Sequence, residues 1–155
     1  MKSRESGTAG ELAVIEVVPC PNCQSQLMAL PAGFPLFDVQ CTRCMFRAQV
    51  KTARCAPPKD QIFGAGWDVL EKTRKTGQLI PPLLVNFQRQ DAAGKTRQEV
   101  YFFQFLTNEN IRRRQRSQDG KRPGYREFNY VGLLNAPQMR LFPPSERRRA
   151  SKLEL

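Results

Sequence analysis

The chain has 155 residues, enough for one domain with its own hydrophobic core and too few for two ordinary domains. Its 40% apolar and 25% charged residues are typical of a soluble globular protein, and the absence of histidine excludes HNH-type nucleases, histidine-pair ribonucleases and Ser-His-Asp or Cys-His catalysts. The net charge of +11 favours nucleic acid as the partner, because clustered Lys and Arg displace counterions from phosphates; a merely solvated basic surface is the alternative.

The first predicted element is a short helix close to the N-terminus. Thr8 is a suitable cap, residues 11–18 supply an apolar stripe, and Pro19 ends the helix. Glu11 lies near its start, where a carboxylate is either a partner of the helix dipole or, as a second hypothesis, a metal ligand. The sequence contains no signal-peptide segment and no apolar run of about 20 residues, so we expect a cytoplasmic protein without a membrane partner.

Two cysteine pairs with the spacing CxxC follow this helix, with seventeen residues between them. Such pairs are typical of a four-thiolate zinc site, in which each pair supplies two ligands to one tetrahedral ion. Because protein ligands fill all four positions, the predicted Zn²⁺ is structural; unmetallated thiols buried as small apolar groups are the alternative. Cys55 is expected to be a free thiol, since cytoplasmic cysteines seldom form disulfides. The predicted zinc ligands are Cys20, Cys23, Cys41 and Cys44.

A β-hairpin is predicted around the second cysteine pair. Apolar and polar residues alternate over 46–51 and again over 37–40, which is the period of half-buried strands, and the cysteines form the turn between them. Gln49 and Lys51 would then point the same way. Pairing of the two strands would bring Asp38 beside Gln49.

This polar row contains the groups that metal-dependent phosphodiester cleavage requires. The reaction needs an anionic oxygen to hold Mg²⁺, a second oxygen ligand, and a cation that orients or activates the attacking water. Asp38 is the predicted magnesium ligand, and Lys51 is the cation. The amide oxygen of Gln49 and the backbone carbonyl of Val50 are further oxygen donors.

The second half of the chain predicts two more helices and three more strands. Trp67 and Leu70 would face inward from the first helix, with Gly77 at its C-terminal cap, and Thr107 would cap the second. A near-continuous apolar run indicates that the first strand is buried on both faces. The expected elements are a helix at 66–76, strands at 82–87 and 100–106 with a turn at 91–95, a helix at 111–116 and a strand at 125–134.

A basic segment runs from Glu109 to Arg126, in which seven Lys and Arg residues stand against two acidic ones. Glycines beside Pro123 indicate an exposed loop that carries guanidinium groups towards a phosphate backbone, with a solvated charged face as the alternative. The predicted nucleic-acid-binding residues are Arg112, Arg113, Arg114, Arg116, Lys121, Arg122 and Arg126.

Four motifs occur in the order Cys20-Pro-Asn-Cys23, Phe37-Asp38, Cys41-x-x-Cys44 and Gln49-x-Lys51. In this order they resemble the catalytic domain of DpnI-type restriction endonucleases, members of the PD-(D/E)XK nuclease superfamily whose catalytic hairpin is interrupted by a zinc knuckle. The likeness continues through the helix near residue 67, the strand at 83–87 and the basic segment, and it covers residues 7–134.

The resemblance implies an α/β fold in which a restriction-endonuclease-like mixed central sheet is flanked by helices and carries an inserted four-cysteine zinc knuckle at residues 20–44. Residues 135–155 would be a flexible basic tail. The implied activity is that of a Mg²⁺-dependent endonuclease of a restriction system, which hydrolyses phosphodiester bonds of double-stranded DNA. Gln49 stands where the family has its second acidic ligand, and Glu11 would restore that charge. The implied catalytic residues are Asp38, Gln49, Lys51 and Glu11.

Members of the family that read methylated adenine carry a winged-helix domain after the catalytic domain, and we do not expect the 155 residues to include one, because the likeness ends at residue 134. We therefore expect a homodimer or a separate targeting protein to supply sequence selectivity. A second hypothesis is a non-catalytic zinc-ribbon protein that binds DNA or RNA through the basic segment. The cysteines and arginines fit both hypotheses equally, whereas a binding protein has no need of the row at Asp38, Gln49 and Lys51.

Overall fold

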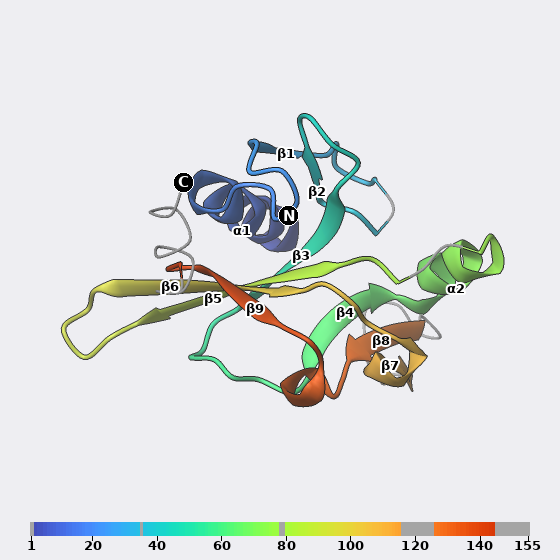
Figure 1. Ribbon diagram of the computed structural model, residues 1–155. Coiled ribbons are helices and arrows are strands. Elements are labelled where there is room, and N and C mark those ends of the chain that lie inside the picture. Colours follow the sequence, from blue (N-terminus) through green and yellow to red (C-terminus); the bar gives the residue numbers. More distant parts are fainter. Residues whose placement is uncertain (1, 35, 78–79, 116–125, 145–155) are drawn as a thin grey trace.

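The computed structural model of the chain describes residues 2–34, 36–77, 80–115 and 126–144. Within these ranges it is an α/β structure with a mixed six-stranded sheet, a three-stranded sheet and two α-helices (Figure 1). Three of the predicted nucleic-acid-binding residues, Arg116, Lys121 and Arg122, lie outside the described residues, as does the tail beyond residue 144.

Four strands follow the first helix and five follow the second, and two single 3-10 turns, η1 and η2, stand between strands. In chain order the elements are α1 (Lys2–Val17), β1 (Leu27–Ala29), β2 (Val39–Cys41), β3 (Arg47–Ala53), β4 (Ile62–Gly66), α2 (Trp67–Lys75), β5 (Leu83–Gln90), β6 (Thr96–Phe103), η1 (Asn108–Asn110), β7 (Ile111–Gln115), β8 (Arg126–Tyr130), η2 (Leu133–Asn135) and β9 (Met139–Phe142).

The six-stranded sheet has the order β1-β2-β3-β5-β6-β9, and the smaller sheet has the order β4-β8-β7. Neighbouring strands of the large sheet are antiparallel except β3 and β5, which are parallel, so the chain crosses over between them through β4 and α2. The pairing of β2 with β3 involves only residues 47 and 48, at the start of β3. The second half of β3 therefore extends beyond the beginning of β2.

Two hydrophobic cores lie on opposite faces of the large sheet. Side chains of β5 alternate between them, because Leu84 packs in the core beneath α1, whereas Leu83 and Val85 pack in the core shared with α2 and the small sheet. All three side chains are fully buried. Figure 1 shows the same division, with α1 on one side of the long strands and β4, β7 and β8 on the other. Strand β3 lies between these two layers.

The hairpin, the helix α2 and the strands β5, β6 and β8 confirm the corresponding predictions. The first five residues of β5 are buried, as the apolar run predicts. Gly77 follows α2 with a φ of +82°, the left-handed conformation expected of a glycine at a helix C-terminus. The expected cap at Thr8 is wrong, because α1 begins at Lys2 and Thr8 lies inside it.

The predicted helix at 111–116 is also wrong, because residues 111–115 form strand β7. Thr107 does cap a helical turn, accepting a hydrogen bond from the backbone N–H of Glu109, but the turn ends at Asn110. Ile111 then pairs with Tyr130 of β8 and packs against a hydrophobic core. A six-residue helix gains little from its own hydrogen bonds, so pairing with a neighbouring strand determines the conformation.

Strand β9 is an element that the sequence pattern did not predict. It pairs with β6 and places Leu141 in the core beneath α1, although it falls in the segment expected to be a flexible tail. The division of the chain into a domain at 7–134 and a tail at 135–155 stays a prediction. In the described part of the chain, no helix has the length and apolar character that a membrane crossing requires.

Candidate functional site

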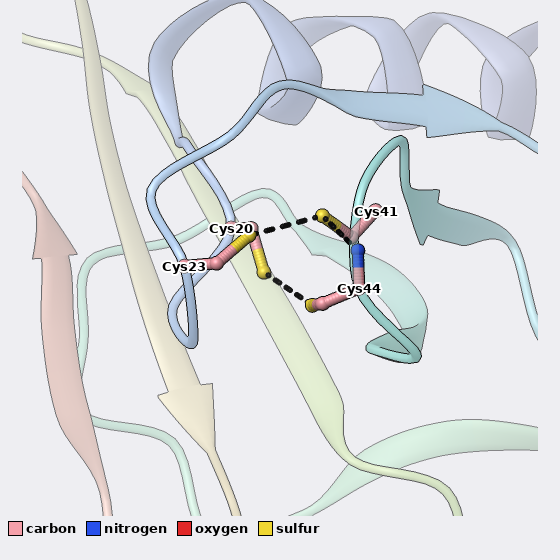
Figure 2. A group of neighbouring side chains, drawn as sticks. All are labelled: Cys20, Cys23, Cys41 and Cys44. Atoms are coloured by element: carbon pink, nitrogen blue, oxygen red, sulfur yellow. Dashed lines mark hydrogen bonds between the residues drawn. The ribbon is translucent and has the colours of Figure 1, made fainter.

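Four cysteine side chains converge from two loops to form a candidate metal centre (Figure 2). Their sulfur atoms all lie within 4.8 Å of one another. The Cys20 and Cys44 sulfurs are 3.5 Å apart, and those of Cys23 and Cys41 are 3.4 Å apart. Four ligands at about 2.3 Å from a tetrahedral ion would have sulfurs roughly 3.8 Å apart, so this arrangement fits a single ion.

Local hydrogen bonds shape each cysteine loop before any ion binds. In the first loop the backbone N–H of Cys20 donates to the carbonyl of Ser25, and Gln24 takes up a φ of +65° that reverses the chain. In the second loop the backbone N–H groups of Arg43 and Cys44 point at the Cys41 sulfur, at 3.3 and 3.4 Å. These two N–H donors fix the direction of the Cys41 sulfur.

The two cysteine loops are also joined directly. The backbone N–H and the hydroxyl of Thr42 both donate to the carbonyl of Gln26, over 3.1 and 2.9 Å. An ion held by all four thiolates would therefore clamp the segment after α1 onto the β2–β3 turn. Cys55 is not part of this group and packs beside the opposite core as a free thiol.

Asp38 is fixed at the start of β2, beside the part of β3 that extends beyond it. Its backbone N–H donates to the carbonyl of Ala48, and one carboxylate oxygen accepts a 2.7 Å hydrogen bond from the backbone N–H of Val50. In an extended strand the N–H and carbonyl of one residue point to the same side, so the Val50 carbonyl also lies towards Asp38. Two oxygen donors thus converge at this sheet edge.

Glu11 brings a second carboxyl group to the same place from α1. Its side chain is hydrogen-bonded to that of Asp38. The helix approaches closely because Gly10 is buried against Thr52 of β3, where any Cβ would collide with the threonine side chain. Burial and the neighbouring Asp38 charge raise the pKa of Glu11 to about 7. Burial also raises the pKa of Asp38, opposed by the Val50 N–H and the Lys51 ammonium.

Lys51 completes the cluster with a positive charge. Burial lowers the pKa of its ammonium group, while the charges of Asp38 and Glu11 oppose that shift. The nitrogen also lies 5.7 Å from the ring centre of Phe63 on β4, over its face. Residues from α1, the β2–β3 hairpin and the small sheet therefore meet around Lys51. The catalytic roles of Glu11, Asp38 and Lys51 stay predictions.

Gln49 faces the small sheet and is held by a residue that the sequence did not single out. Its side chain is only 4% exposed, and its amide oxygen accepts a hydrogen bond from the hydroxyl of Tyr130 on β8. Tyr130 is itself buried beside Phe128. No local pattern indicates this contact, because it joins residues that are 81 positions apart. The amide oxygen predicted as a metal ligand is therefore already engaged.

The arginines of β7 divide between the two faces of the small sheet, because successive side chains of a strand point in opposite directions. Arg112 is opposite Asn129, which is in turn opposite Phe63, so these three share the face whose Phe63 ring lies against Lys51. Tyr130, which holds Gln49, lies on the other face. Arg114 points the same way as Arg112. Arg113 points to the other face, where its guanidinium lies 5.6 Å from the ring centre of Trp67.

Strand pairing relates Arg112 to the carboxylate cluster through Phe63. Two strand steps of about 4.8 Å separate Arg112 from Phe63, whose ring centre lies 5.7 Å from the Lys51 nitrogen. Arg126, exposed at the start of β8, is paired with Gln115 at the far end of β7. The basic side chains on the described part of β7 thus flank the cluster without belonging to it.

Comparison of the chain with models of protein families gave no match, and comparison with curated protein sequences gave none either. The likeness to DpnI-type endonucleases therefore stays a prediction that rests on the motifs themselves.

Proposed function

We propose that this protein is a Mg²⁺-dependent endonuclease that hydrolyses double-stranded DNA in the manner of the DpnI-type catalytic domain. The observation that carries the proposal is the cluster of Glu11, Asp38 and Lys51 at one edge of the central sheet. Two carboxyl groups and an amine from three separate segments are held together in partly buried surroundings. A protein that only binds nucleic acid gains nothing from this arrangement, which is costly to bury.

The two carboxyl groups fit a divalent cation. They are close enough to share a hydrogen bond, and burial raises the pKa of both. Two such carboxylates would be stabilised in their charged form by a cation bound between them. Glu11, Asp38 and the carbonyl of Val50 would hold Mg²⁺, which prefers oxygen ligands. The ion, when bound, would act as a Lewis acid towards the scissile phosphate.

Lys51 would position the attacking water next to that phosphate. Burial lowers the pKa of its ammonium group, which eases proton exchange with the water, and the two carboxyl groups keep the side chain directed at the site. Gln49 would act mainly by linking β3 to Tyr130, so that the small sheet stays packed against the cluster. Glu11 would thus replace the second acidic ligand that the family pattern places at Gln49.

The zinc and DNA assignments belong to the same proposal. Zn²⁺ held by the four cysteines would be structural, because no ligand position is left for water. Arg112 and Arg114 would contact backbone phosphates of a duplex lying across the face that carries Phe63. The protein would act in the cytoplasm. A homodimer or a targeting protein would add sequence selectivity to a single small domain.

Cleavage of supercoiled plasmid tests the proposal directly. The protein should nick and linearise the plasmid with Mg²⁺ or Mn²⁺ and leave it intact with EDTA. Lys51→Ala should abolish cleavage, whereas Lys59→Ala, which removes the same charge from an exposed loop position, should not. Absence of cleavage under all metal conditions by a folded, zinc-loaded sample would contradict the proposal.

A non-catalytic zinc-ribbon protein that binds DNA or RNA is the second candidate. One observation favours it: the neutral Gln49 replaces an acidic ligand, and its amide oxygen is engaged by Tyr130. This candidate predicts that Asp38→Asn and Lys51→Ala change neither metal affinity nor any activity. Nucleic-acid binding by the basic face would then be the whole function.

A further inference from the structure

A second basic surface lies apart from the carboxylate cluster. It is a groove of about 790 Å³ between α2 and the segment that joins β6 to η1. Trp67, Arg74 and Lys75 line it from α2, and Phe105 and Asn108 line it from the other wall. The proposed cleavage chemistry uses none of these residues.

Two guanidinium groups lie over the indole ring of Trp67. Arg74, from the same helix, lies 6.0 Å from the ring centre, and Arg113, from β7, lies 5.6 Å from it. The ring is partly buried against the core, so its position is fixed by packing. Cations over an indole face leave the ring edge and its surroundings electropositive, which suits an anionic ligand.

The opposite wall offers a second aromatic ring. Phe105 is 59% exposed, an unusual position for a phenylalanine unless something covers it. The groove also contains Glu71, whose carboxylate lies 3.9 Å from the Lys75 ammonium. With that charge balanced, Arg74 leaves the groove with a positive surplus, and Arg113 adds a second positive charge beside it, over the Trp67 ring.

We propose that this groove binds an unpaired stretch of DNA, with a base stacked on Phe105 and phosphates near Arg74 and Arg113 beside Trp67. An exposed aromatic ring close to basic side chains suits single-stranded nucleic acid, because every base has a face that can stack. A base inside a duplex has both faces covered by its neighbours and cannot use such a ring. The occupant is therefore a single strand and not the duplex.

The position of Arg113 indicates how such a strand would reach the groove. Arg112 and Arg114 lie on the face of the small sheet whose Phe63 ring lies against Lys51, while Arg113 lies on the opposite face beside Trp67. A single strand leaving a duplex on the first face is flexible enough to turn around the edge strand β7, whereas a duplex is too stiff. This inference rests on the proposed function only for the duplex part of the substrate.

The chain contains a single tryptophan, so its fluorescence reports on the groove. We would use the zinc-loaded Asp38→Asn protein without added Mg²⁺, which prevents cleavage and leaves the cysteine site intact. The substrates are a blunt duplex, the same duplex with a short oligothymidylate tail, and the tailed duplex with abasic sites in the tail. The tail should quench Trp67 and tighten binding by about tenfold. Blunt and abasic substrates should do neither.

Variants on the two faces provide matched controls. Phe105→Ala, at an exposed position, and Arg113→Ala should each remove most of the gain from the tail without changing affinity for the blunt duplex. Arg112→Ala makes the same charge change one residue away and should weaken blunt and tailed duplexes alike. Equal quenching by blunt and tailed duplexes, or an undiminished gain with the abasic tail, would overturn the inference.

Two readouts keep this test separate from that of the proposed endonuclease. If plasmid cleavage fails while the tail still quenches Trp67, the groove inference holds without the enzyme. If cleavage occurs and the tail has no effect on fluorescence or affinity, the inference falls alone.

Discussion

The cysteine centre and the carboxylate cluster lie at opposite ends of the same hairpin but are assembled in different ways. The cysteines come in two short loops whose own hydrogen bonds pre-shape them. The carboxylate cluster depends on a helix, a hairpin and a strand that meet only in the folded chain. We have proposed that the first arrangement serves stability and the second serves chemistry, and mutations should then separate the two.

The largest expected effect is the loss of one cysteine ligand. Cys41→Ser should release the metal and lower the free energy of unfolding by at least about 3 kcal/mol, because binding energy at such a site is folding energy. Elemental analysis and denaturant unfolding would measure both. Wild-type protein should contain one zinc per chain, and Cys55→Ser should keep it. A folded wild-type sample without zinc would contradict the structural role.

Substitutions in the carboxylate cluster should affect cleavage and not stability. Asp38→Asn keeps the hydrogen bond from Val50 but removes the charge, and Glu11→Gln likewise removes a charge from α1. Cleavage should fall to background in both variants, while the free energy of unfolding changes little. DNA affinity without metal should hold or rise slightly, because a negative charge facing phosphate is gone. Glu16→Gln, exposed on the same helix, is the control and should cleave normally. Full activity of Asp38→Asn would remove the cluster from the mechanism.

The basic face should affect binding alone, and by a smaller amount. Replacing Arg112 and Arg114 together with Ala should lower the slope of log K against log salt by about 2 for a blunt duplex, if each contacts one phosphate. Arg113→Ala should leave that slope unchanged because its side chain points to the other face. Equal effects from all three positions would show that the duplex lies elsewhere.

Gln49→Glu should have the smallest effect. A carboxylate there can still accept the Tyr130 hydroxyl hydrogen bond, and its second oxygen would add charge beside Lys51, so Mg²⁺ affinity should rise by less than about tenfold. Gln40→Glu on β2, where the side chain meets Arg47, adds the same charge to the hairpin away from the cluster. Calorimetric titration with Mg²⁺ would compare them. Identical affinities would place residue 49 beyond reach of the ion.

Sequence reasoning succeeded where a few neighbouring residues determine the structure. The CxxC spacing indicated the cysteine cluster, the alternation around Gln49 indicated the hairpin, and the apolar run indicated β5. It failed at β7, whose conformation is decided by pairing with β8. It also missed the contact between Gln49 and Tyr130, since a single pair of distant residues leaves no periodic signal.

Glu11 is an intermediate case between the features that the sequence indicated and those that it missed. The sequence could name it as a candidate ligand but could not place it, because its position depends on how closely α1 approaches β3. That approach is set by Gly10, which has no pattern of its own.

The contact at Gly10 has a consequence for mutational tolerance. A residue with no functional group should be among the least replaceable in the chain, because even a methyl group there would push α1 away from Thr52 and part the two carboxyl groups. Positions 10 and 52 should therefore constrain each other. Alanine at position 10 should be harmful alone and better tolerated with a smaller residue at position 52, a non-additive pair of substitutions that involves neither charge nor catalysis.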